Sequence, residues 1–126
     1  PWPDHYKQVE EKLGRAGGIL LGMLLPKWIS GEIEEIAQDE SLATYTKLIK
    51  KEDGLINLDG RADQNFRKML AYSNWPGAYI FIKKRNGKEV RVVIKDGQLD
   101  GGKFIPTRVI PEGKREMDWQ DFLRGN

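Results

Sequence analysis

Residues 78–95 read AYIFIKKRNGKEVRVVIK, two runs of β-branched and aromatic residues that flank an Asn-Gly pair. Such a pair between two such runs is the strongest short-range signal for a β-hairpin, since both residues tolerate the backbone angles of tight turns. The sequence therefore predicts two antiparallel strands here. We expect Phe81 to pair with Val92, which turns the side chains of Tyr79 and Phe81 toward the core.

Helix, turn and strand signals surround this hairpin. Residues 61–72 place apolar side chains at helical spacing. The NWPG segment at 74–77 should end this helix, because proline disfavours helical angles in the residue before it and glycine permits positive φ. Residues 103–110, KFIPTRVI, predict a third strand with Pro106 at an edge or a bulge, and residues 118–124 predict a short last helix. Short strands after a helix, with turns between them, predict a small β-barrel or a curled sheet.

Residues 1–60 show a different pattern. Apolar residues at three- and four-residue steps from Asp4 to Leu25 predict an amphipathic helix, and Pro26 should kink or end it. Residues 38–58 hold no sustained period and predict an extended, solvated connector. The longest apolar run, ILLGMLLP, is shorter than the roughly 20 residues that cross a bilayer, so we expect no membrane partner.

Candidate catalytic and metal-binding residues are few. The chain has no cysteine and one histidine, His5. Disulfides, thiolate metal sites and histidine clusters are therefore excluded, and no serine or threonine has a histidine partner for a nucleophilic triad. Carboxylate pairs such as Glu34 with Glu35 fit solvated faces and helix caps. We predict no catalytic residue and no metal site in this chain.

Charge is the clearest functional signal. The net charge is +2, but residues 1–60 carry seven basic and eleven acidic side chains. Residues 61–115 carry thirteen basic and five acidic side chains, an excess of +8. Such an excess predicts a surface for a polyanion, because phosphate binding needs cations and no reading of bases. Scattered lysines that only aid solubility are the alternative, and the charges alone leave both open.

Three segments in order resemble one protein family. Residues 38–56 (QDESLATYTKLIKKEDGLI), 74–79 (NWPGAY) and 111–125 (PEGKREMDWQDFLRG) are similar to the linker and C-terminal domain of the methionyl-tRNA formyltransferases. That family commonly shows Gln-Asp-x-x-x-Ala-Thr, Lys-Glu-Asp-Gly-x-Ile, an aromatic-Pro-Gly-Ala segment and Pro-Glu-Gly-Lys in this order. The chain departs from the family at residues 56–58, where Ile-Asn-Leu replaces the usual Ile-Asp-Trp.

The resemblance implies a fold and a domain order. The implied fold class is mainly β with helices, an OB-like small β-barrel preceded by a helical arm and an extended linker. Residues 1–37 would be the helical end of the catalytic domain, residues 38–58 the linker, and residues 59–126 the barrel. Trp75 would anchor the corner between the helix and the first strand in the core.

The resemblance also implies a function. The chain would be the tRNA-binding part of a cytoplasmic transferase of translation initiation, which moves a formyl group from 10-formyltetrahydrofolate to methionyl initiator tRNA. The donor site and the family's catalytic Asn, His and Asp belong to an upstream domain, against which this chain would pack. The expected nucleic-acid-binding residues are Lys83, Lys84, Arg85, Lys88, Arg91, Lys95, Lys103, Arg108, Lys114 and Arg115.

Two other functions remain open. One is a purely structural C-terminal domain with no nucleic-acid role, as in the related nucleotide-sugar formyltransferases. The other is a free-standing single-strand binder of the OB type, which needs exposed aromatic side chains on its sheet for base stacking. Because we expect the strand aromatics in the core, the sequence disfavours this last function.

Overall fold

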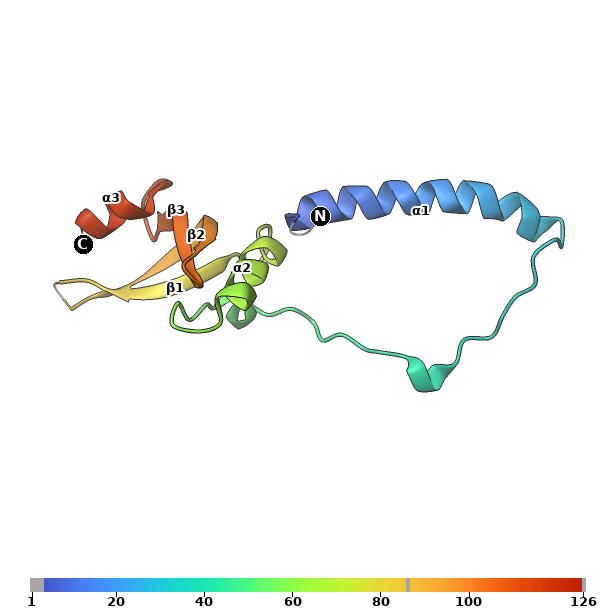
Figure 1. Cartoon of the computed structure of the whole chain (residues 1–126), viewed down its shortest axis with the longest axis horizontal. Helices are drawn as coiled ribbons and strands as arrows, with labels where there is room; N and C mark the ends of the chain where they lie inside the picture. Colours follow the sequence, from blue (N-terminus) through green and yellow to red (C-terminus); the bar gives the residue numbers. More distant parts are fainter. Residues whose placement is uncertain (1–3, 86, 126) are drawn as a thin grey trace. The chain divides into compact units, whose positions relative to one another are not determined.

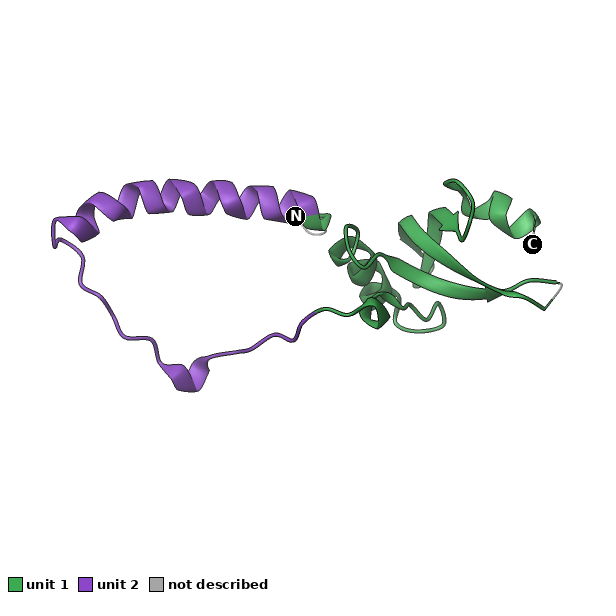
Figure 2. Ribbon diagram, turned by 180° about the vertical axis from the view of Figure 1, so that it is seen from behind, with its two compact units in different colours: residues 1–6, 49–126 green, residues 7–48 purple. Residues whose placement is uncertain are grey.

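The computed structural model describes residues 4–85 and 87–125 and divides the chain into two compact units. One unit holds residues 7–48, and the other holds residues 1–6 together with residues 49–126 (Figure 2). The first unit is a helix and an extended segment. The second contains the sheet, and we call it the sheet unit.

Helix α1 (Tyr6–Ile29) is exposed along its length, and none of its residues is buried. The helix continues past Pro26, so the proline does not end it. Proline removes only one N–H donor, and the N–H groups of Ser30 and Glu32 still bond to carbonyls of the last turn. The extended segment that follows is interrupted by one short 3-10 turn, η1 (Glu40–Leu42). No helix within the described parts of the chain is long and apolar enough to cross a membrane.

The second unit is a four-stranded sheet with two helices (Figure 1). Its main elements are α2 (Ala62–Ala71), β1 (Ala78–Lys83), β2 (Glu89–Asp100), β3 (Lys103–Pro111), β4 (Met117–Asp118) and α3 (Trp119–Arg124). The strands are antiparallel in the order β1-β2-β3-β4, so β1 and β4 form the edges. The predicted class, mainly β with helices, is confirmed, and the sheet is open rather than closed into a barrel.

One face of the sheet carries the core. Val92 and Val109, on neighbouring strands, are fully buried there. Helix α2 adds Met69, and α3 adds Trp119 and Phe122, whose stacked rings lie 5.5 Å apart between centroids. Burying a large apolar side chain stabilises a fold by about 1.5–3 kcal/mol. This cluster therefore fixes which face of each strand points inward.

The hairpin register differs by one residue from the predicted one. Phe81 lies opposite Arg91, and Ile80 lies opposite Val92. Because side chains alternate along a strand, this shift turns Ile80 into the core and Tyr79 and Phe81 to the other face of the sheet. The predicted core position of Phe81 is wrong.

The length of the hairpin loop explains the shift. The Lys84 N–H donates to the Lys88 carbonyl at 2.8 Å, so the loop between them spans three residues. Gly87 ends this loop with a φ of 81°, as three-residue hairpin loops often require. Asn86, on which the turn prediction partly rested, lies outside the described residues.

The corner before β1 does not bury its tryptophan. Trp75 is 52% exposed, so its predicted role as a core anchor is wrong. The Trp75–Pro76 peptide bond is cis. The large aromatic anchors of the core are instead Trp119 and Phe122 of α3 and Phe104 of β3.

The corner instead packs its backbone against the short turn η2 (Lys51–Gly54). A Cβ atom on Gly54 would lie 3.1 Å from Cγ of Pro76 and closer still to the carbonyl oxygen of Gly77. The Lys-Glu-Asp-Gly motif and the Pro-Gly motif, which are separate in sequence, thus contact each other directly. Only glycine fits at this contact.

The residues after η2 then join the edge of the sheet. Leu55 forms a parallel bridge with Tyr79, and the Ile56 N–H donates to the Tyr79 carbonyl at 2.8 Å. Ile56 is buried in the core. The end of the extended segment is therefore fastened to β1 by backbone bonds and by one apolar side chain.

Candidate nucleic-acid interface

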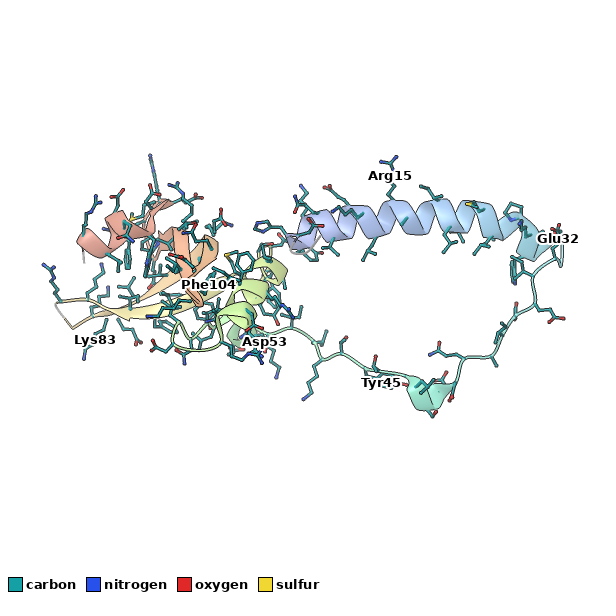
Figure 3. The ribbon with its side chains drawn as sticks, viewed as in Figure 1. Arg15, Glu32, Tyr45, Asp53, Lys83 and Phe104 are labelled. Carbon is teal, nitrogen blue, oxygen red and sulfur yellow. The ribbon has the colours of Figure 1, made fainter. Side chains whose placement is uncertain are left out.

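Four basic residues gather at the end of the β1–β2 hairpin, and we call them the basic tip. Lys83 ends β1 (Figure 3), Lys84 and Lys88 flank the three-residue loop that follows, and Arg85 lies in that loop. The hairpin projects from the rest of its unit (Figure 1). Glu89, opposite Lys83, is the one acidic residue among residues 78–95. Closely spaced cations with so little compensation create a positive local potential.

Two more of the predicted residues lie at the same end of the sheet. β3 runs antiparallel to β2, so it ends beside the part of β2 that belongs to the hairpin. The Glu112 N–H donates to the Arg91 carbonyl at 2.9 Å, which ties the β3–β4 loop to the hairpin. Lys114 and Arg115 are exposed in this loop. The fold thus brings cations from two loops to one end of the sheet.

Two other predicted residues lie away from this end. Lys103 pairs with Asp100 at the opposite end of β2 and β3. Lys95 lies where the β2–β3 register shifts, between Ile94 and Asp96. Neither side chain joins the basic tip.

Arg108 is held by two carboxylates. Its Nε lies 2.9 Å from Oε1 of Glu116, and its Nη1 lies 3.1 Å from Oδ2 of Asp118. The hydrogen bond that Arg108 donates to Glu116, with the charge of Asp118, raises the pKa of the Arg108 guanidinium above its usual value. Since both carboxylates already compensate this cation, Arg108 is the least available of the predicted phosphate ligands.

Arg91 lies in a cluster with two aromatic rings on the face of the sheet away from the core. Its guanidinium carbon lies 4.1 Å from the centroid of the Tyr79 ring. The Tyr79 and Phe81 rings meet edge to face, with centroids 5.6 Å apart. Tyr79 is 7% exposed and Phe81 is 49% exposed. We call Tyr79, Phe81 and Arg91 the aromatic face.

Sequence reasoning missed the aromatic face because the register was set one residue off. The signal that could have found it is the loop itself. A three-residue loop that ends in glycine pairs Lys84 with Lys88 and therefore places Phe81 opposite Arg91. An aromatic residue opposite a basic one in the middle of two strands favours an outward position for both.

A further set of cations lines an open cavity of about 580 Å³ beside α2. Lys68 donates from Nζ to the Leu55 carbonyl at 2.8 Å, and Arg61 pairs with Asp63 at 2.9 Å. The hydrogen bond from Arg61 lowers the pKa of the Asp63 carboxyl. Arg67 also lines the cavity and is exposed. Structural contacts engage two of these three cations, so the cavity is a weaker anion site than the basic tip.

Several carboxylates in the described residues serve as caps or ion-pair partners. The Ser41 hydroxyl and N–H donate to Asp39 at 2.6 and 2.9 Å, and these bonds lower the pKa of its carboxyl. Asp39 caps the turn η1, which is a structural task. Within residues 4–85 and 87–125, no group of three or more carboxylate or histidine side chains could hold a metal ion.

Known proteins are similar to this chain over most of its length. Residues 48–104 match the family model described as the formyl transferase C-terminal domain. The methionyl-tRNA formyltransferase of Chloroflexus aurantiacus is 40% identical over 82% of this chain and 32% of its own length. The enzyme of the same name from Herpetosiphon aurantiacus is 35% identical over 90% of this chain and 44% of its own length.

A relative of lower sequence identity matches a larger share of this chain. The methionyl-tRNA formyltransferase of Bacillus velezensis is 29% identical over 97% of this chain and 45% of its own length. The chain thus spans less than half the length of each of these relatives. The matches confirm the resemblance that the sequence motifs predicted.

Proposed function

Since this chain belongs to the formyl transferase C-terminal domain family, we propose that it is the tRNA-binding part of a methionyl-tRNA formyltransferase. The whole enzyme would transfer a formyl group from 10-formyltetrahydrofolate to the amino group of methionyl initiator tRNA in the cytoplasm. This chain would position the tRNA by its phosphates. The observation that carries the proposal is the basic tip, with Lys114 and Arg115 at the same end of the sheet.

The chemistry of transfer would belong to the rest of the enzyme. Acyl transfer to an amine needs a general base and a group that stabilises the developing oxyanion. Asp39 caps a turn and Asp63 pairs with an arginine, which are structural tasks. We therefore assign the formyl donor site and the catalytic residues to the upstream domain. The isolated chain, given donor and methionyl-tRNA, should form product at no more than the uncatalysed rate in a turnover assay.

The exposed apolar side chains of α1 support packing against that upstream domain. Leu13, Leu21, Met23 and Ile29 are each more than half exposed, which is unusual for so many large apolar side chains on one helix. The relatives are more than twice as long as the part that this chain matches. Their remaining length would supply the surface that covers this helix.

A titration of tRNA at two salt concentrations tests the function. Neutralising phosphates releases counterions, so affinity should fall steeply as salt rises. Replacing the four residues of the basic tip with alanine should weaken binding and reduce the salt slope by about one unit for each lost phosphate contact. Initiator and elongator tRNAs should be affected alike, because phosphate contacts do not read bases.

The control removes the same number of positive charges from the other unit. Its four substitutions are Lys7→Ala, Arg15→Ala, Lys27→Ala and Lys47→Ala. This variant should keep the wild-type salt slope. If the wild-type chain binds no tRNA at low salt, or binds it without salt dependence, the domain is a structural support of the kind found in the nucleotide-sugar formyltransferases.

A further inference from the structure

Tyr79 is buried without being part of the core. Only 7% of it is exposed, yet it lies outside the cluster of core residues that α2 and α3 cover. What covers it on the opposite face is the guanidinium of Arg91, 4.1 Å from its ring centroid, and the ring of Phe81. The sheet therefore has a second packed layer, small and partly cationic, on its outer face.

This packing fixes the Phe81 ring and leaves part of it open. The edge-to-face contact, with an interplanar angle of 87°, is a preferred geometry for aromatic pairs and holds the ring in one orientation. Phe81 nevertheless remains 49% exposed in the middle of a strand. A ring that is already oriented loses little conformational entropy when a flat group stacks on it.

The charges beside Phe81 indicate what the flat group is. Lys83 follows it on the same side of β1, about 7 Å along the strand, and Arg91 lies opposite it on β2. The rest of the basic tip lies in and beside the loop just beyond. An aromatic side chain bordered by cations fits an unpaired nucleotide, whose base stacks on the ring while its phosphate meets a cation.

We propose that the aromatic face is a stacking site for one unpaired nucleotide of the bound RNA. The proposal rests on the proposed function, since it names the part of the RNA that this end of the sheet contacts. Base-paired segments meet the basic tip through phosphates alone, because their bases are stacked within the duplex. The aromatic face adds affinity only where a base is free.

The test compares two probes on the full chain by fluorescence anisotropy at low salt. One is a labelled oligouridylate of about eight nucleotides, within the usual site size of such domains, and the other has the same backbone with every base removed. The wild-type chain should bind the probe with bases about tenfold more tightly. Phe81→Ala should abolish this difference and leave affinity for the base-free probe unchanged.

Three further variants control for packing and aromaticity. Phe81→Trp should retain the preference for bases, and Phe81→Leu, which keeps an apolar side chain, should lose it. Leu99→Ala removes another half-exposed apolar side chain from β2 and should change neither affinity. Thermal melts of each variant establish that it is folded.

The outcomes separate this proposal from the function on which it rests. If the wild-type chain binds both probes equally and salt weakens both, the stacking site is refuted while phosphate binding stands. If Phe81→Ala weakens both probes equally, the ring supports the strand and the proposal is also refuted. If neither probe nor tRNA binds at low salt, the proposed function itself fails.

Discussion

Gly54 joins two motifs by having no side chain. Its backbone lies against Pro76 and the carbonyl oxygen of Gly77, and a Cβ atom there would overlap that oxygen. Its φ lies outside the left-handed region, so the requirement for glycine comes from space and not from backbone angle. The motif around Gly54 could be read from the sequence, but its contact with a segment more than twenty residues away could not.

Gly54→Ala should therefore destabilise the sheet unit by about 3 kcal/mol, because backbone on both sides must move to admit one methyl group. Gly125→Ala is the control. There the new Cβ would meet only ordinary contacts, at 3.6 Å from the nearest atom, and the cost should be within about 1 kcal/mol. Urea denaturation of both variants measures the difference. Similar midpoints would show that η2 and the corner are not in contact.

Trp75 and Trp119, both described by the structure in the sheet unit, should differ sharply. Trp119→Ala removes a core ring that is 8% exposed and should cost about 3–5 kcal/mol. Trp75→Ala removes a side chain that is half exposed and should cost about 1 kcal/mol or less. Denaturant midpoints of the two variants measure these losses of stability. A larger loss for Trp75→Ala than for Trp119→Ala would show that Trp75 is a core anchor.

At the scale of elements, local sequence signals were sufficient to predict where helices and strands lie. They were not sufficient to predict how the strands pair. Helix α2 and strands β1 and β3 lie within a few residues of their predicted bounds, because periodicity and turn residues are local properties. The register of β1 on β2 depends on how many residues the loop holds, and one residue reverses both faces. The aromatic face was missed for this reason alone.

Neighbouring residues of β1 give a direct test of the register. Ile80→Ala should cost about 2–5 kcal/mol because Ile80 points into the core at 3% exposure. Phe81→Ala should cost about 1 kcal/mol because Phe81 is half exposed on the other face. Thermal melts measure both losses of stability. If Phe81 lay opposite Val92 in the core, Phe81→Ala would be the more destabilising of the two substitutions.

At the scale of the whole molecule, the chain consists of two units that differ in how many of their residues are buried. The core residues all lie between Ile56 and Phe122, within the sheet unit, whereas α1 buries none of its residues. The sequence predicted the split in charge between the two parts. The segment from Ile49 to Leu55 has no sequence period, and its place in the sheet unit depends on the contacts of Leu55 and Ile56 with Tyr79.

The sheet unit should fold without the rest. A chain of residues 49–126 should unfold cooperatively with a midpoint close to that of residues 1–126, because it retains the whole core. Circular dichroism should show less helix in proportion to the loss of α1. A non-cooperative melt of the shorter chain would mean that residues 7–48 stabilise the sheet.

The bond between Ile56 and Tyr79 sets an order of events during synthesis. Tyr79 is made about 23 residues after Ile56, a delay of about one to five seconds at ordinary rates of translation. The ten residues of helix α2 lie between them in the sequence. All residues of α2 are therefore made before Tyr79, so the bond that joins the linker to β1 forms only after the whole of α2 has been synthesised.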